Sequence, residues 1–347
     1  MKESVLIIAE AGVNHNGSEE LAFQLIESAA ECGADAVKFQ TFKADSLVSK
    51  GTKTADYQKT QTGEADQYSL IKNLELSYEL HQKLFRHCQM CEIEFMSTPF
   101  DTESADFLKS LGVSRIKIPS GELTNIPLLK HVAAMSLPMI LSTGMADMQE
   151  IEDAVSVVKS VRAENKIAEP LSDALCILHC TSNYPTKNED VNLRAMRAIA
   201  ENCGLPVGYS DHTLGTLVSV AAVAAGAAVI EKHFTVDRNL PGPDHQASLT
   251  VAELRDLIDQ IRMIETCMGD GIKKPRDSEL PVRELVRRSV VITKNSSAGD
   301  VLSEENMALL RPASGIEPKH FESLIGKRLL TNCLAGELLS WADIESA

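Results

Sequence analysis

The chain has 347 residues, 44% of them hydrophobic and 24% charged, proportions that are typical of a folded globular protein. This length exceeds one ordinary domain and suits a barrel of about 250 residues followed by a small domain. The formal net charge of −15 makes nucleic acid and anionic membranes unfavourable partners, so we expect neither.

The absence of a recognisable signal peptide or membrane-spanning apolar run predicts a cytoplasmic protein. The eight cysteines are scattered, and only Cys88 and Cys91 lie close together in the sequence. They lack the second pair that would complete a zinc site. We therefore expect reduced, structural thiols.

Apolar segments recur at regular spacing and alternate with helical patterns. The expected strands are Val5–Ala9, Ala36–Gln40, Ile93–Ser97, Arg115–Pro119, Met139–Ser142, Leu175–Cys180, Val207–Ser210 and Val229–His233. The clearest helical patterns are Glu19–Cys32, Tyr78–Met90, Thr102–Leu111, Asp147–Val161, Leu193–Asn202, Leu217–Gly226 and Val251–Met268. Eight such alternations predict an α/β fold, the (β/α)8 TIM barrel. A doubly wound sheet is the alternative, but no glycine-rich dinucleotide turn follows the first strand.

Polar residues stand at the carboxyl end of every expected strand. In chain order they are Glu10; Lys38 and Gln40; Ser97 and Thr98; Lys117 and Ser120; Ser142 and Thr143; Thr181 to Tyr184; Ser210 to His212; and Glu231 and His233. Parallel barrels carry their active sites at this end. The concentration therefore predicts an enzyme.

Two further segments interrupt or follow the barrel pattern. The connection Thr41–Ser77 is the longest, and we expect a lid or binding loop, with a solvated excursion as the alternative. We assign residues 1–268 to the barrel and 269–282, which contain several glycines and a proline, to a linker. Residues 283–347 read as short strands and turns, so we expect a small, mostly β domain.

His212 and His233 end successive strands of the expected barrel. Neighbouring strands lie about 4.8 Å apart, so the two imidazoles could share one metal ion. Asp211 and Glu231 stand close to them in the sequence. The alternative is a pair of core or capping histidines, which is what we expect of His15 and His179.

Lys38 and Lys117 lie within apolar strands, where a buried amine needs an anion or loses its proton. Beside Ser120, Ser142 and Ser210, the pair could hold a phosphate and a carboxylate, and one lysine alone could form a Schiff base. Salt bridges to Glu10 or Glu231 are the structural alternative. Glu10 itself could be a general acid–base group, or an inward carboxylate that only neutralises a lysine.

These residues belong to ordered motifs that resemble the sialic acid synthase family over nearly the whole chain. The motifs are Ile8–Gly17, Val37–Gln40, Ser97–Phe100, Lys117–Glu122, Ser142–Met145, His179–Pro185, Gly208–His212, Glu231–Phe234 and Gly242–Ser248. Arg311–Ile316 resembles the antifreeze-like (SAF, β-clip) domain of that family. The resemblance implies a bond-forming transferase that condenses phosphoenolpyruvate with the open-chain aldehyde of an N-acylmannosamine. It also implies a divalent cation, Mn²⁺ or Mg²⁺, held by His212 and His233.

The resemblance also implies roles for individual residues. Lys38, Lys117, Ser120, Ser142 and Ser210 match phosphoenolpyruvate-binding positions; Glu10 matches the catalytic carboxylate, with Glu231 a second candidate; and Gln40, Glu122, Tyr184 and Asp244 match the sugar side. Thr98 and Ser182 join the substrate-binding set, although either Ser182 or Asn183 could be the residue that contacts the ligand. Arg311 matches an arginine placed over the site of the other subunit, which implies a domain-swapped homodimer.

Within the family we expect first an N-acetylneuraminate synthase, and as the alternative an N,N'-diacetyllegionaminate synthase that uses 2,4-diacetamido-2,4,6-trideoxymannose. A metal-free Schiff-base aldolase using Lys38 or Lys117 is a second mechanism. The alternative outside the enzymes is a sugar-binding barrel without catalytic activity.

Overall fold

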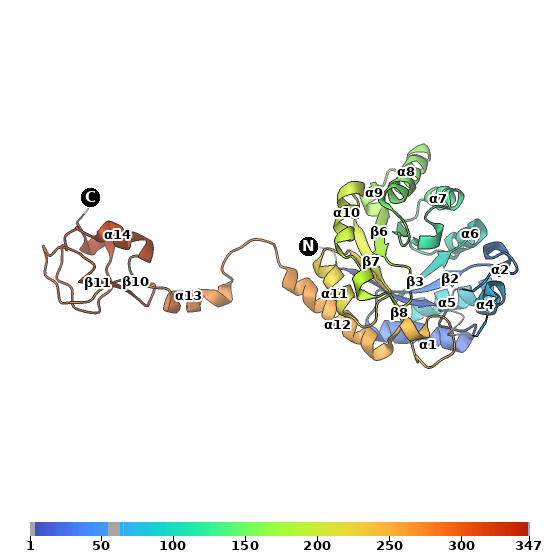
Figure 1. Cartoon of the computed structure of the whole chain (residues 1–347), viewed down its shortest axis with the longest axis horizontal. Helices are drawn as coiled ribbons and strands as arrows, with labels where there is room; N and C mark the ends of the chain where they lie inside the picture. The colour runs from blue at the N-terminus through green and yellow to red at the C-terminus, as the bar shows by residue number, and fades with distance from the viewer. Residues whose placement is uncertain (1–3, 55–62, 65, 346–347) are drawn as a thin grey trace. The chain divides into compact units, whose positions relative to one another are not determined.

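The computed structural model describes residues 4–54, 63–64 and 66–345. The chain divides into two compact units, Met1–Gly269 and Asp270–Ala347. The first unit contains an eight-stranded parallel barrel ringed by helices (Figure 1).

Every expected barrel strand is present. The strands are β1 (Leu6–Gly12), β2 (Ala36–Thr41), β3 (Glu94–Pro99), β4 (Ile116–Ile118), β5 (Met139–Ser142), β6 (Leu175–Cys180), β7 (Val207–Asp211) and β8 (Val229–Thr235). They pair in parallel in the order β3-β2-β1-β8-β7-β6-β5-β4, and β3 and β4 are in contact. The sheet is therefore a nearly closed barrel, and the predicted fold class is confirmed. A two-residue strand, β9 (Leu249–Thr250), extends the pairing beside β8.

Helices connect successive strands. Among the described helices of the first unit are α1 (Glu19–Cys32), α5 (Tyr78–Met90), α6 (Thr102–Leu111), α7 (Ile126–Ala133), α8 (Met148–Glu164), α9 (Leu171–Ala174), α10 (Arg194–Cys203), α11 (Leu217–Ala224) and α12 (Val251–Met268). Local sequence fixes their ends: Ser18 caps α1 by accepting from the Leu21 backbone N–H, and Gly33 ends it with a φ of 85°. The main core lies between these helices and the outer faces of the strands.

Side-chain alternation along each strand decides which groups enter the barrel. On β8, Glu231 reaches across the interior to Lys117 of β4, whereas the next residue, Lys232, pairs with Asp211 on the outer side. The lower interior is apolar and includes Ile8, Met96 and other strand residues. Polar groups therefore concentrate toward the carboxyl ends of the strands.

The connection after β2 contains two helices that the sequence pattern did not predict. They are α2 (Ala44–Leu47) and α4 (Gln67–Leu74). Asp66 caps α4, because its carboxylate accepts from the Ser69 backbone N–H. Both are short, and polar residues surround them, so the segment reads as a loop. Part of the expected loop, residues 55–62 and 65, lies outside the described residues.

The second unit contains an antiparallel pair, β10 (Ser289–Ile292) and β11 (Met307–Leu310). It also has a short helix, α13 (Leu280–Val286), that begins inside the expected linker, and a one-turn helix, α14 (Phe321–Leu324). Its small core gathers Val290, Leu302 and Leu339, among others. In the described part of the chain, no helix combines the length and the apolar character that a membrane crossing requires.

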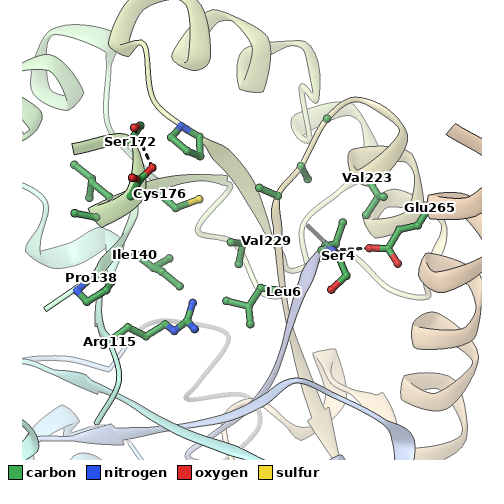
Figure 2. Close-up of a pocket in the computed structure, with 18 of the residues that line it drawn as sticks. Ser4, Leu6, Arg115, Pro138, Ile140, Ser172, Cys176, Val223, Val229 and Glu265 are labelled. Carbon is green, nitrogen blue, oxygen red and sulfur yellow. Dashed lines mark hydrogen bonds between the residues drawn. The ribbon is translucent and has the colours of Figure 1, made fainter. Parts of the chain in front are cut away.

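A cavity of about 830 Å³ lies at the amino end of the barrel. Leu6, Ile140, Cys176 and Val229 line it (Figure 2). The charge of Arg115 at its edge is already paired with Glu94, 2.8 Å away. Despite its size, this cavity lies at the end of the strands opposite to the expected catalytic groups.

Candidate active site

A cavity of about 500 Å³ opens at the carboxyl ends of the barrel strands. Fourteen of the site residues expected from the sequence line it: Glu10, Lys38, Gln40, Thr98, Lys117, Ser120, Ser142, Ser182, Tyr184, Ser210, His212, Glu231, His233 and Asp244. Glu122 does not line it, because its carboxylate accepts from the Asn125 side chain, 2.6 Å away. Arg311 belongs to the second unit and follows β11.

Four buried charged residues form the floor of this cavity. Lys117 donates to both oxygens of Glu231, at 2.7 and 2.8 Å, and Ser210 donates to the same carboxylate at 2.8 Å. Lys38 lies 2.7 Å from Glu10 and 3.7 Å from Glu231. Both lysines are thus ion-paired, the structural alternative that the sequence left open.

The two carboxylates of this cluster have different proton affinities. Burial raises the pKa of Glu10 to about 7 even though Lys38 opposes the shift, and the neighbouring charge of Glu231 adds to it. Burial acts in the same direction on Glu231, but Lys117 and Lys38 outweigh it and hold the pKa of Glu231 well below its usual range. Glu231 is therefore ionised at neutral pH, whereas Glu10 exchanges its proton there.

This difference decides how the cluster receives an anion. Burial lowers the pKa of Lys117, but Glu231 at 2.7 Å favours the charged amine. With both lysines charged, Glu231 ionised and Glu10 protonated, the floor of the cavity carries one net positive charge. Ionised Glu10 cancels that charge, so protonated Glu10 favours an anionic ligand.

Hydroxyl groups surround the charged cluster. Ser142 is buried at the end of β5, and its hydroxyl has no hydrogen-bond partner among the described residues. Ser120 accepts from the Gly144 backbone N–H at 2.9 Å and lies 3.1 Å from the Cys180 sulfur. A buried hydroxyl without a partner is costly, so Ser142 is suited to bind a ligand oxygen.

His212 and His233 both face the cavity, with ring centroids 5.6 Å apart. The Nδ1–H of His212 donates to the Thr181 carbonyl at 2.7 Å, which leaves its Nε2 lone pair available, as in histidines that bind metals. The Nδ1 of His233 is buried without a hydrogen-bond partner in the described structure. Burial lowers the pKa of His212 and holds the pKa of His233 well below its ordinary value, so both rings are neutral.

These two histidines fit a divalent cation that completes its coordination with water and substrate. A cluster of three or more histidine, cysteine or acidic side chains suited to a metal does not occur within the described ranges. The Asp244 carboxylate lies 3.9 Å from the His233 Nδ1 and is a further oxygen donor beside the two rings. Burial raises the pKa of Asp244 to about 6.

Behind the barrel wall, a second buried ion pair connects the two strands that carry the histidines. Lys232 donates to Asp211 at 2.8 Å and to the Thr213 carbonyl at 2.6 Å, and Ser219 of α11 donates to the same carboxylate. The sequence shows Lys232 only as one more charge beside His233. Its partners come from another strand and from a helix, so its contribution is visible only in the folded chain.

The sequence also did not reveal an apolar side of the cavity. Phe42, Leu47, Leu70, Ile71, Leu74 and Phe100 line it, and we call these six residues the apolar wall. Leu70, Ile71 and Leu74 have helical spacing in the sequence, which was the available signal. Cys180 is a further lining residue that was not singled out.

A parallel barrel that gathers charged, hydroxyl and imidazole groups at its carboxyl end defines the class of barrel enzymes. Comparison with known proteins gives the family. The model of the NeuB family matches residues 25–273, and that of the SAF domain matches residues 287–345. The chain belongs to the NeuB family, and it is an enzyme of the nonulosonic acid synthase class.

Similar proteins support the same assignment across the whole chain. An N,N'-diacetyllegionaminic acid synthase of Legionella pneumophila is 53% identical, covering 98% of this chain and 94% of its own. The enzyme of that name from Campylobacter jejuni is 48% identical, covering 97% and 99%. The crystal structure of a sialic acid synthetase from Leptospira borgpetersenii, in complex with citrate, has 36% identity and a TM-score of 0.70, covering 81% and 90%.

The raised pKa of Glu10 predicts a pH-dependent stability that Glu10→Gln removes. Between pH 4.5, the ordinary pKa of a glutamate side chain, and about pH 7, Glu10 loses its proton in the unfolded chain but keeps it in the folded chain. The stability of the wild type relative to the variant therefore falls as pH rises through this window, by at most about 1.4 kcal/mol per pH unit. Urea unfolding at pH 5, 6, 7 and 8 measures the difference.

Glu164→Gln is the matched control, because Glu164 is exposed at the end of α8. Its stability relative to the wild type should not follow the same trend. Parallel wild-type and Glu10→Gln curves across the window would mean that Glu10 ionises normally in the folded protein.

Proposed function

We propose that the chain is an N,N'-diacetyllegionaminate synthase, which condenses phosphoenolpyruvate with 2,4-diacetamido-2,4,6-trideoxymannose and releases phosphate. The identity of 53% to the Legionella enzyme over 98% of this chain carries the choice of product. The sequence motifs placed N-acetylneuraminate first and this product second. The two relatives favour the second.

The charged floor supports a role in binding phosphoenolpyruvate. Lys38 and Lys117 supply the positive charge, and the hydroxyls of Ser120, Ser142 and Ser210 lie around them as donors. Thr98 accepts from Lys38 at 3.0 Å and orients that amine. Ser142, which is buried and unpartnered, is the observation that most directly supports a bound anion here.

The overall reaction balances with one water molecule. C3 of the enol attacks the aldehyde carbon of the open-chain sugar, water adds at C2, and phosphate leaves by cleavage of its bond to C2. The aldehyde oxygen must gain a proton as it becomes a hydroxyl. Glu10, whose pKa is about 7, is suited to supply it, while ionised Glu231 keeps Lys117 and Ser210 in position and is the second candidate for proton transfer.

His212 and His233 would hold a divalent cation, Mn²⁺ or Mg²⁺. A cation at this position would act as a Lewis acid on the aldehyde and make it more electrophilic. The neutral rings and the Thr181 carbonyl behind His212 support this role.

Gln40, Tyr184 and Asp244 line the cavity near the two histidines and are suited to contact the sugar. The Tyr184 ring lies 4.1 Å from that of His212. Ser182 also lines the cavity, which favours it over Asn183 as a ligand contact. Glu122 would need to release Asn125 to take part in sugar binding.

We extend the proposal to assembly and location. Arg311 of one subunit would complete the site of the other in a domain-swapped homodimer, as the resemblance of Arg311–Ile316 to the family's antifreeze-like domain implies. The reaction would take place in the cytoplasm, where phosphoenolpyruvate is made.

The geometry weighs against a Schiff-base aldolase. A lysine must lose its proton to attack a carbonyl, and a close carboxylate opposes that loss. Both candidates have such a partner, Lys38 at 2.7 Å from Glu10 and Lys117 at 2.7 Å from Glu231. Phosphate release that survives borohydride treatment would agree with this conclusion.

The choice of acceptor can be measured directly. With phosphoenolpyruvate and a divalent cation, we expect phosphate release with 2,4-diacetamido-2,4,6-trideoxymannose at a kcat/KM at least about tenfold above that for N-acetylmannosamine, equivalent to about 1.4 kcal/mol. Omission of phosphoenolpyruvate is the control. A preference for N-acetylmannosamine would return the assignment to N-acetylneuraminate, and release with neither sugar would contradict the synthase proposal.

Replacing a proposed metal ligand should weaken metal binding itself. His212→Ala should lower the affinity for Mn²⁺ by about tenfold or more in calorimetric titration and suppress turnover, because one of two protein ligands is lost. His131→Ala is the control, since His131 lies on α7 and pairs with Asp106. Unchanged Mn²⁺ affinity, or full activity after exhaustive chelation, would contradict the assignment of a metal ion to His212 and His233.

A mixing experiment tests the swapped dimer. His212→Ala and Arg311→Ala should each be nearly inactive, but unfolding and refolding them together at equal amounts should restore about a quarter of wild-type activity. Half of the dimers would be mixed, and each would contain one complete site. Mixed dimers without activity would show that Arg311 acts on its own barrel, and full activity of Arg311→Ala alone would show that Arg311 takes no part in the reaction.

A further inference from the structure

The cavity has two chemically different sides. Its floor, formed by strand residues, is charged and hydroxyl-rich, whereas the apolar wall comes from the segment after β2 and from the end of β3. Phe42 and Phe100 pack edge to face, with ring centroids 5.9 Å apart. Leu47 of α2 and Ile71 of α4 are only partly buried, so their side chains retain exposed surface.

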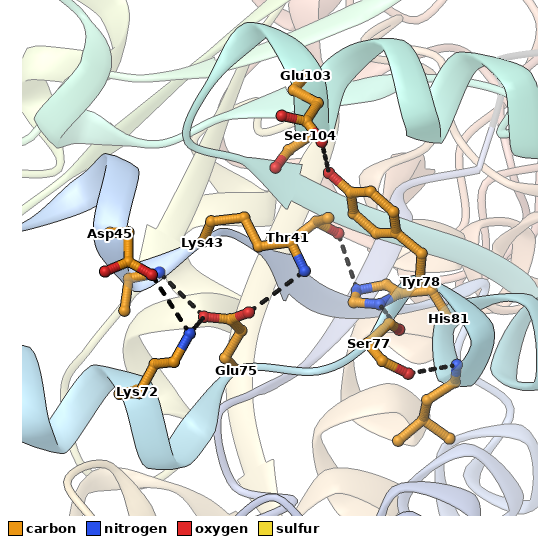
Figure 3. Close-up of polar contacts among 12 residues, drawn as sticks. Thr41, Lys43, Asp45, Lys72, Glu75, Ser77, Tyr78, His81, Glu103 and Ser104 are labelled. Atoms are coloured by element: carbon orange, nitrogen blue, oxygen red, sulfur yellow. Dashed lines mark hydrogen bonds and ion pairs between the residues drawn. The ribbon is translucent and has the colours of Figure 1, made fainter.

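Ion pairs at the base of the segment hold the apolar wall in place. The Glu75 carboxylate accepts from Lys43 at 3.2 Å, from Lys72 at 2.9 Å and from the Ala44 backbone N–H at 3.1 Å (Figure 3). This single carboxylate therefore joins the start of α2 to the end of α4. Asp45 adds a second contact to Lys72, at 3.6 Å.

A second set of contacts fixes the segment to the barrel. His81 of α5 lies 2.9 Å from the Thr41 hydroxyl and, through its other ring nitrogen, 2.9 Å from the Ser77 carbonyl (Figure 3). The apolar wall is thus anchored at both of its sequence ends. The positive charges of Lys43 and Lys72 are paired with Glu75 and Asp45, and neither lysine is among the residues that line the cavity.

We propose that the apolar wall recognises the C6 methyl group of a 6-deoxy acceptor sugar. This inference rests on the proposed function, because it concerns the acceptor of that reaction. The aldehyde carbon C1 must lie near Glu10 and the histidines for the new bond to form. C6 is the carbon farthest from C1 along the open chain, and it meets the wall that stands beyond the strand ends.

The chemistry of the wall favours a methyl over a hydroxymethyl group. Burying a methyl group against Leu47, Leu70 and Ile71 removes apolar surface from water. A hydroxyl at the same place loses its water partners, and none of the six wall side chains can donate or accept a hydrogen bond. The polar side chain that lines the cavity from this segment is Gln67, at the start of α4 and one turn before Ile71. Hydrophobic pockets discriminate only moderately against one added hydroxyl, so we expect about a 10- to 100-fold preference in kcat/KM.

Four acceptors separate the two positions at which the candidate sugars differ. All four are mannose derivatives with a 2-acetamido group. They carry either an acetamido or a hydroxyl group at C4, and their C6 is either a methyl or a hydroxymethyl group. The inference predicts that wild-type kcat/KM is higher for the C6-methyl member of each pair that shares a C4 group. Equal values within both pairs would overturn it.

Two single substitutions test whether the wall is responsible. Ile71→Thr and Leu47→Asn, on separate helices, should each reduce the C6 methyl-to-hydroxymethyl ratio about three- to tenfold, while the KM for phosphoenolpyruvate stays unchanged. Met263→Thr is the control, because Met263 is 67% exposed on α12. Melting temperatures of all three variants show whether folding is preserved.

The outcomes distinguish this inference from the proposed function. If both C4-hydroxyl sugars are better acceptors but the C6 ratio persists and falls in the variants, the choice of product fails and the wall's role stands. The product stands if the C4-acetamido sugars are preferred. The wall's role at C6 is wrong if the variants change only the ratio of kcat/KM between C4-acetamido and C4-hydroxyl sugars, or lower kcat/KM equally for all four.

Discussion

The ion pairs between Lys117 and Glu231 and between Lys38 and Glu10 are the constraint on which the site depends. Four ionisable groups share the interior of one barrel, where an unpaired charge would be very costly. Their pairing allows the strands to close with these side chains inside. The pairing also fixes the amines where an anion can be received, so the same contacts serve folding and ligand binding.

The strands β7 and β8 extend this arrangement to the metal-binding candidates. On the inner face of the two strands, Ser210 donates to Glu231, and each of these residues stands two positions before a histidine. On the outer face, Lys232 forms an ion pair with Asp211. Because neighbouring residues of a strand point to opposite faces, these two contacts hold both sides of the same strand pair. The positions of His212 and His233 are therefore fixed by contacts of the residues adjacent to them.

The barrel and most of its site could be predicted because both depend on local patterns. An apolar run that ends in a polar residue indicates a strand end, and parallel strands bring such ends together whatever lies between them. Pairing partners could not be predicted in this way: the choice of Glu231 over Glu10 as the partner of Lys117 depends on barrel closure. The apolar wall was missed because α2 and α4 are short and lie in a polar segment. Glu122 was expected on the sugar side but does not line the cavity, and its carboxylate accepts from the nearby Asn125 side chain.

A division of labour follows from where each group is anchored. The backbones of strand residues such as Lys117 and Glu231 are held by the parallel pairing of the barrel, so the groups that handle the reacting atoms share one frame. The apolar wall is held instead by Glu75 and His81, which lie on the outer segment and on α5. We therefore expect substitutions in that segment to change the shape and polarity of one side of the cavity and to leave the charged floor in place. A barrel built in this way can keep its chemistry while its acceptor changes, which is consistent with a family whose members make different nonulosonic acids.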